Sequence, residues 1–148
     1  MLFSKTNDFM TKEKSELMIE LMINPYCFSY FPDEWRGDKE LALEAIRQLP
    51  HNYYYLSRDL KKDRIIGLNT ILSNGMLFGS LSEDLRRDKE IAFIACESHP
   101  FNVKYVSEEL KKDKDFYNDC SSVARDRYLN QYSEEVWLKK WRDENETN

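Results

Sequence analysis

The chain has 148 residues, of which 41% are hydrophobic and 33% charged, which is typical of one ordinary globular domain with its own core. Its formal net charge is −5, with 22 Lys and Arg interleaved among 27 Asp and Glu, so the composition disfavours nucleic-acid binding. Neither a signal-peptide pattern nor an apolar stretch of about 18 residues is present, so we expect a cytoplasmic protein with no membrane segment.

Residues 1–11 are expected to form a flexible N-terminal arm, and a repeat organises the chain after them. The anchor of the repeat is an aspartate that recurs every 25 residues, at Asp38, Asp63, Asp88 and Asp113. Each aspartate follows a basic pair or its relic, and a large apolar residue stands three positions before it. Glu13 precedes Asp38 by the same distance, which predicts a degenerate first copy beginning near Lys12.

A helix is predicted to begin at each repeated aspartate, because an aspartate N-cap accepts hydrogen bonds from the free N–H groups of the first turn. The third, fourth, seventh and eighth positions after it are apolar or small in most copies and lie on one helical face. The helices should run about ten residues, to near Gln48 and Ser73. Pro50, Pro100 and the Asn74-Gly75 pair supply the breaks.

A second apolar group follows in each copy and predicts a short helical turn, at Tyr53 and Leu56, Phe78 and Leu81, and Val103 and Val106. Ser57, Ser82 and Ser107 come next and are predicted to cap a last turn that ends in the basic pair. Basic residues at that end complement the helix dipole, which gives them a structural role. We interpret the glycines of residues 74–79 as a turn between helices.

The predicted fold class is all-α: tandem 25-residue helical repeats stacked as a short α-solenoid or a compact helical-repeat domain. A single copy cannot bury its apolar face alone, so successive copies must pack on one another. Residues 12–142 are expected to form a single helical-repeat domain, with units near 12–37, 38–62, 63–87, 88–112 and 113–142. Residues 143–148 are short and polar and are predicted to be a disordered tail.

Runs such as 38–45 (DKELALEA) and 85–92 (LRRDKEIA) resemble the tandem helical repeats catalogued as domain of unknown function forty-one sixteen. The resemblance covers roughly Trp35 to Phe116. It implies a helical repeat and supplies no activity and no catalytic residues. The fold expectation is therefore strengthened, and the function stays open.

The search for chemical motifs predicts no catalytic residue, no cofactor and no metal ligand. Glycine-rich phosphate loops, zinc-binding helices and nucleophile elbows are absent from the sequence. His51 and His99 stand beside prolines at different repeat positions, where an imidazole is ordinarily solvated. The sequence contains many pairs of neighbouring carboxylates, which are explained as side chains on solvated helix faces. We therefore expect a protein that is not an enzyme.

The three cysteines are far apart and are expected to be free thiols. Equivalent positions of successive copies are called columns here. Cys96 and Cys120 fall in core columns and should behave as small buried hydrophobes. Cys27 shares its column with Asn52 and Asn102, so it is the cysteine expected at the surface.

Comparison of the columns also selects candidate binding residues, because a position that is apolar in one copy and polar in the others is not demanded by the fold. Ile65 stands in the column of Glu40 and Glu90, and Leu72 in that of Arg47 and Glu97. The predicted protein-binding patch consists of Ile65, Asn69, Leu72, Met76 and Ile94. The alternative is that these residues meet the N-terminal arm or the tail of the same chain.

Aromatic residues supply further candidates. Trp137 and Trp141 are four apart on a predicted C-terminal helix and would anchor a partner, or alternatively cap the last repeat. Tyr54 lies in the column of Ser29, Gly79 and Lys104 and is expected to face water, where it could join a contact.

These observations favour a non-enzymatic protein-binding repeat protein, an adaptor or an inhibitor that occupies a partner protein's surface. A role like that of the small acidic blockers of phage or toxin systems is suggested by analogy in size and charge. Two alternatives remain: an enzyme with an unrecognised site, and a nucleic-acid binder using a basic stripe of Lys61, Lys62, Arg86, Arg87, Lys111 and Lys112. A homodimer formed through the patch or the Trp137 helix is compatible with the main hypothesis.

Overall fold

The computed structural model describes residue 9, residues 12–129, residue 139 and residues 142–143. Every regular element in these described ranges is an α-helix or a 3₁₀-helix. The all-α prediction is confirmed. The chain divides into two compact units, Met1–Ser73 and Asn74–Asn148.

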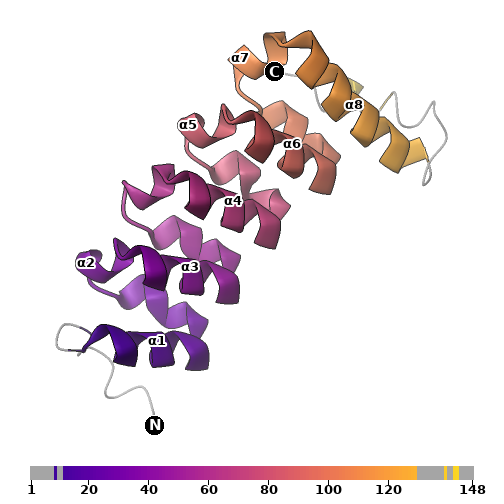
Figure 1. Cartoon of the computed structure of the whole chain (residues 1–148). Helices are drawn as coiled ribbons and strands as arrows, with labels where there is room; N and C mark the ends of the chain where they lie inside the picture. Colours follow the sequence, from indigo (N-terminus) through magenta and orange to yellow (C-terminus); the bar gives the residue numbers. More distant parts are fainter. Residues whose placement is uncertain (1–8, 10–11, 130–138, 140–141, 144–148) are drawn as a thin grey trace. The chain divides into compact units, whose positions relative to one another are not determined.

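The first unit contains seven helices in its described part: α1 (Lys14–Ile23), η2 (Pro25–Tyr30), α2 (Asp33–Arg36), α3 (Lys39–Gln48), η3 (Pro50–Tyr55), η4 (Leu60–Lys62) and α4 (Arg64–Ser73). The ten-residue helices α1, α3 and α4 lie side by side, and the 3₁₀-helices η2 and η3 form a second row against them (Figure 1). A copy of the repeat is therefore a long helix, a 3₁₀-helix and a short last turn.

The second unit repeats the same order with η5 (Gly75–Ser80), α5 (Glu83–Arg86), α6 (Lys89–Ser98), η6 (Pro100–Tyr105), α7 (Glu108–Lys112) and α8 (Lys114–Leu129). Helix α8 has 16 residues and is longer than the predicted ten. Its sequence has no proline or glycine at the position where Pro50 and Pro100 follow α3 and α6, so nothing breaks it there.

The predicted helix caps are confirmed. Oδ1 of Asp38 accepts hydrogen bonds from the N–H groups of Glu40 and Leu41, both at 3.0 Å, and Asp63 and Asp88 make the same pair of bonds. The serine caps are present as well: Ser57, Ser82 and Ser107 accept bonds from the N–H groups of Leu60, Leu85 and Leu110. The boundaries of the repeat are therefore set by local hydrogen bonding.

The core consists of the apolar columns that the sequence indicates. In α3 the buried residues are Leu41, Ala42, Ala45 and Ile46, and the residues of the same columns in α6 are buried too. The second apolar group is buried in every copy, with Tyr53, Phe78 and Val103 no more than 1% exposed. Burying these side chains supplies most of the folding free energy, at about 25 cal/mol for each Å² of apolar surface.

Two predictions about small residues were wrong. Residues 74–79 do not form a simple turn, because Gly75–Ser80 is a 3₁₀-helix capped by Asn74, which accepts a bond from the N–H of Met76. The two glycines permit close packing in this copy, although other copies have side chains at both columns. A Cβ at Gly75 would lie 1.8 Å from Oγ of Ser98, and one at Gly79 would lie 3.1 Å from the Tyr105 ring.

The second wrong prediction concerns Cys27, which is only 6% exposed instead of lying at the surface. Its column is an interior one. Asn52 and Asn102 are also buried, because their amide groups donate hydrogen bonds to backbone carbonyls. The polar side chains of this column form buried hydrogen bonds, so their polarity does not indicate contact with solvent.

Candidate protein-binding surface

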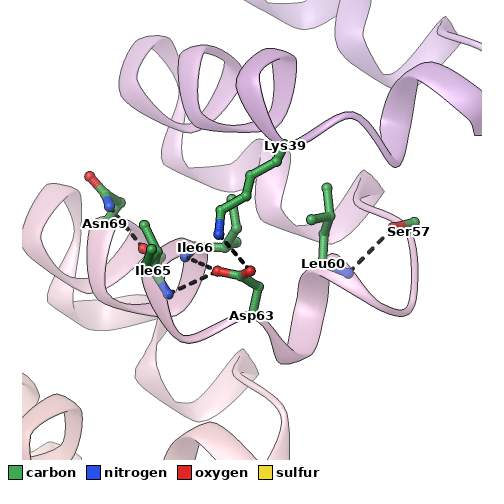
Figure 2. Close-up of polar contacts among 7 residues, drawn as sticks. All are labelled: Lys39, Ser57, Leu60, Asp63, Ile65, Ile66 and Asn69. Atoms are coloured by element: carbon green, nitrogen blue, oxygen red, sulfur yellow. Dashed lines mark hydrogen bonds and ion pairs between the residues drawn. The ribbon is translucent and has the colours of Figure 1, made fainter.

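The predicted patch is exposed where it lies on α4. Ile65 is 51% exposed and Leu72 is 64% exposed, and they stand two helical turns apart on one face. Asn69 lies between them, also exposed, with its Nδ2 donating a 2.8 Å hydrogen bond to the carbonyl oxygen of Ile65 (Figure 2). Two apolar side chains and one tethered amide thus line the outer face of α4.

The local cap fixes this end of α4. Asp63 accepts hydrogen bonds from the N–H groups of Ile65 at 2.9 Å and Ile66 at 3.1 Å, and its other oxygen accepts one from Nζ of Lys39 at 2.8 Å (Figure 2). Burial raises the pKa of Asp63, but the hydrogen bonds from Lys39 and the two backbone groups outweigh it, so that pKa is lowered overall. Lys39 of one copy therefore pairs with Asp63, the N-cap residue of the next long helix.

A second exposed apolar row lies on α1 and was not predicted. Ile19 is 57% exposed, Met22 65% and Ile23 75%. Ile19 stands in the column of Asn69, and Met22 in that of Leu72. Only three copies were compared in the sequence analysis. The same comparison of columns, extended to the degenerate first copy, would have predicted this row.

A groove of about 370 Å³ opens on α3, between these two helices. Its lining comes from all three long helices of the first unit: Met18, Glu40, Leu43, Glu44, Ile46, Arg47, Asn69 and Ser73. Apolar and charged side chains are mixed in this lining. Asn69 is the one residue that belongs both to the predicted patch and to the groove.

The charged groups of the groove are engaged in ion pairs. Nζ of Lys14 lies 2.7 Å from Oε2 of Glu40 and 2.9 Å from Oδ2 of Asp38, and Nη2 of Arg47 lies 2.6 Å from Oε1 of Glu44. Hydrogen bonds from Arg47 and Gln48 lower the pKa of Glu44. Glu44 is therefore ionised at neutral pH, and the groove presents fixed charges between two apolar rows.

Exposed tyrosines gather on the 3₁₀-helices of the first unit. Tyr54 is 48% exposed, as predicted, and Tyr55 on the same helix is 44% exposed. Tyr26 and Tyr30 on η2 are 69% and 72% exposed and were not predicted. Tyr30 and Tyr55 share a column, so a comparison of equivalent repeat positions could have predicted this pair of tyrosines.

The remaining predicted residues lie elsewhere. Met76 is 69% exposed on η5, and Ile94 is half-buried on α6, both in the second unit. Trp137 and Trp141 lie outside the described residues. The patch on α4 is thus formed by Ile65, Asn69 and Leu72 alone.

The basic stripe is largely occupied by contacts within the chain. Arg86 donates to the carbonyl oxygen of Tyr105 at 3.1 Å, Arg87 pairs with Glu83 at 2.8 Å, and Lys111 pairs with Glu108 at 2.8 Å. The pairs of Arg87 and Lys111 are local to their helices, and the bond of Arg86 joins successive copies, which supports the structural interpretation of the repeated bases.

Metal-binding clusters and membrane-spanning helices are absent from the part of the chain that the structure describes. That part contains no group of three or more His, Cys, Asp or Glu side chains placed to hold a metal ion. None of its helices combines the length and the apolar character needed to cross a bilayer.

Comparison with known proteins identifies the repeat. No curated protein and no solved structure matches the chain. The family model described as "Domain of unknown function (DUF4116)" matches in four overlapping segments, residues 16–61, 38–86, 68–111 and 88–135. Together these segments cover most of the chain, and each spans parts of successive copies of the 25-residue repeat. The chain therefore belongs to the DUF4116 family.

Proposed function

We propose that this chain is a non-enzymatic protein-binding repeat protein, a small adaptor or inhibitor that occupies the surface of a partner protein. The observation that carries the proposal is the outer face of the first unit. Exposed apolar rows on α1 and α4 flank the groove on α3, and their members are between 51% and 75% exposed. Clustered apolar exposure of this kind usually marks a protein contact.

The chemistry of the surface supports binding more than catalysis. A catalytic acid needs a raised pKa to carry its proton at neutral pH. In the groove the pKa of Glu44 is lowered, and that of Arg47 is raised by its bond with Glu44. Both groups stay charged through the physiological range, which suits a fixed recognition surface.

The finer proposal is an inhibitor of the kind found in phage and toxin systems. Its support is the small size of the chain and its net charge of −5. A small acidic protein is attracted electrostatically to basic surfaces and can cover them. The negative net charge supports fast association, and burial of the apolar rows would keep dissociation slow.

The first experiment is an affinity capture from the native host's lysate with the wild type and an Ile65→Glu, Leu72→Arg double variant. A matched control places charge changes in the same two columns of α6, with Glu90→Lys and Glu97→Arg. Circular dichroism checks that all three chains remain helical. We expect a partner that the wild type and the control retain and the Ile65, Leu72 variant loses.

Three other results would count against the α4 face as the contact with a different protein. Equal capture by all three chains would show that the α4 face is not the contact. Loss of every retained species with nuclease, together with steep salt dependence, would favour nucleic-acid binding. Dimerisation of the wild type in sedimentation, lost in the Ile65, Leu72 variant, would assign the face to self-association.

A further inference from the structure

The long helices of successive copies pack through two stripes of side chains. Counted from the repeat aspartate, or from Glu13 in the first copy, positions 1, 5 and 9 face the next copy and are called the rear stripe. Positions 2, 6 and 10 face the preceding copy and are called the front stripe. Nζ of Lys14 at position 1 lies 2.7 Å from Oε2 of Glu40 at position 2 of the next copy. Met18 at position 5 and Glu44 at position 6 of the next copy both line the groove, so the two stripes meet between neighbouring helices.

The front stripe of α1 is open, although that of α3 is covered by the copy before it. On α3 the Glu44 side chain is only 19% exposed and Gln48 at position 10 is half-buried. The same positions of α1 hold Ile19 and Ile23, which are 57% and 75% exposed. Residue 9 and residues 12–13, the described residues before α1, contain no helix that could cover them. Two isoleucines therefore stand exposed where the next copy has polar side chains.

The 3₁₀-helix of the first copy is open on the same side. A Cβ on Gly79 at position 16 would lie 3.1 Å from the ring of Tyr105, which is at position 17 of the next copy. Position 17 therefore also faces the preceding copy. Tyr105 and Tyr55 at this position are 39% and 44% exposed, whereas Tyr30 of the first copy is 72% exposed. Ile19, Ile23 and Tyr30 are called the end face of the first unit.

The last long helix of the second unit has a different outer side. The rear stripe of α8 is Lys114, Asn118 and Ser122, and all three are exposed. Position 5 is apolar and half-buried in every earlier copy, at Met18, Leu43, Leu68 and Phe93. Stacked repeats stay soluble when their terminal copies carry a polar outer face. Helix α8 has such a polar stripe, whereas α1 presents apolar side chains.

We propose that the end face binds the end face of a second copy of this chain and forms a two-fold symmetric dimer through α1 and η2. The equivalent stripe packs against a helix of the same repeat wherever a preceding copy is present, so a helix of this kind is the natural occupant. Head-to-tail stacking on α8 would set polar side chains against the isoleucines. Symmetric pairing instead sets apolar side chains against apolar ones.

The charge and size of the end face suit a dimer. The front stripe of α1 consists of Ser15, Ile19 and Ile23, so two copies can meet there without opposing like charges. Three large side chains that are 57–75% exposed, contributed twice by the symmetry, would bury on the order of 1,000 Å² in total, near the lower limit of a specific interface. The dimer is therefore expected to dissociate on dilution.

The dimer goes beyond the proposed function and does not depend on it. Met22, the other exposed apolar residue of α1, is at position 9 and belongs to the rear stripe, on the side of the groove. The α4 face and the groove thus stay open in the dimer. Two joined copies would present two such faces, which raises the avidity for a partner that has more than one binding site.

The test is sedimentation of the full chain over a concentration series from about 1 to about 200 μM. We expect the mass to rise from 17.8 kDa toward twice that value. The double variant Ile19→Glu, Ile23→Gln gives α1 the side chains that α3 carries at the same positions, so it should fold. It should weaken dimerisation at least about 100-fold.

Met22→Arg is the matched control, because it places the arginine of the same column, Arg47, on the rear stripe of the same helix. It should change the dimer dissociation constant by less than about fivefold. Circular dichroism checks that all chains remain helical. Ile23→Cys tests the symmetry, since the natural cysteines are at most 6% exposed and a short bismaleimide should join the two introduced thiols across the interface.

A wild type that stays monomeric over the whole series would overturn the proposal. So would species larger than a dimer, or equal dimerisation of the wild type and the Ile19, Ile23 variant. The Ile65→Glu, Leu72→Arg variant should remain a dimer, and the Ile19, Ile23 variant should still capture the partner from lysate. Failure of the dimer and failure of the α4 contact are therefore observed separately.

Discussion

The hydroxyl of Tyr53 donates a 2.8 Å hydrogen bond to the carbonyl oxygen of Lys61. This bond ties the 3₁₀-helix of one copy to the last turn of the same copy. Tyr53 is 1% exposed, so its ring is part of the core and its hydroxyl reaches the polar edge. The column holds Phe28, Phe78 and Val103 in three other copies, so the repeat does not require a hydroxyl at this position.

Replacing Tyr53 with Phe should lower the free energy of unfolding by about 1 kcal/mol, because the Lys61 carbonyl loses a donor while the ring still packs. Urea denaturation followed by circular dichroism measures the change. Tyr26→Phe, at a ring that is 69% exposed, is the control and should change stability by less than about 0.5 kcal/mol. Equal stabilities for the two variants would show that the bond contributes nothing.

Asn52 offers a second prediction. Its Nδ2 donates to the carbonyl oxygens of Pro25 and Ala45, both at 3.0 Å, and so links two copies of the first unit. Asn52→Leu should lower the free energy of unfolding by about 1–2 kcal/mol, because the Pro25 carbonyl loses this donor. The leucine side chain itself should fit, since Leu77 stands in the same column. Asn52→Asp should cost more, since a carboxylate would face two carbonyl oxygens.

Chemical denaturation at neutral pH compares the two Asn52 variants. Acidification provides an independent check, because protonation lets the aspartate donate a hydrogen bond again. The deficit of Asn52→Asp should therefore shrink as the pH falls, whereas that of Asn52→Leu should not. A variant with leucine that is more stable than the wild type would show that the amide bonds do not offset burial of the polar group.

The ion pair of Lys39 and Asp63 predicts an acid dependence. The folded state lowers the pKa of Asp63 below its ordinary value of 3.8. A lowered pKa adds stability that is fully present above the unfolded-state pKa and is lost as the pH falls through the folded-state pKa. The contribution should thus disappear from about pH 4 downward.

Asp63→Asn isolates this effect, since asparagine also caps helices. The variant should lose at most about 1 kcal/mol at neutral pH, because both partners are partly exposed to solvent. Its stability should fall less steeply than that of the wild type below about pH 4. Parallel pH profiles for the two chains would exclude a role of this carboxylate in acid sensitivity.

Two glycines give a matched pair of substitutions. Gly75→Ala should destabilise the second unit by up to about 1 kcal/mol, because the new Cβ would overlap Oγ of Ser98 and that hydroxyl must rotate away from its bond to the Ala95 carbonyl. At Gly37 the closest contact of a new Cβ is 3.3 Å, and its column holds Lys62, Arg87 and Lys112. Gly37→Ala should therefore be neutral or stabilising by up to about 1 kcal/mol. Thermal unfolding measures both, and the reverse order would contradict the packing argument.

The sequence predicts the helix boundaries well because their causes are local. Asp38 and Ser57 form their capping bonds with residues two or three positions away, so the repeated letters alone locate the helix starts. The environment of Cys27 could not be predicted in this way. The asparagines of its column, Asn52 and Asn102, suggested a surface position, but they are buried because their amides donate hydrogen bonds to carbonyls 27 residues away, a contact that no local pattern contains.

The exposed apolar residues of the first unit were predicted in part for a related reason. Ile65 and Leu72 stood out because neighbouring copies are charged at their columns. The row on α1 did not stand out, since the first copy begins with Glu13 instead of aspartate and was left out of the comparison. The groove depends on how three helices pack side by side, which the columns alone do not specify.

The link from Lys14 to Asp38 and from Lys39 to Asp63 always spans 24 residues. Removal of one whole copy, such as residues 39–63, would place Arg64 directly after Asp38, so that a base again follows the capping aspartate. Loss or gain of a single residue would instead change the spacing of the pair that spans it. A change of copy number in steps of 25 residues therefore keeps the lysine-to-aspartate spacing of the remaining copies, so a longer or shorter array needs no new contact of this kind.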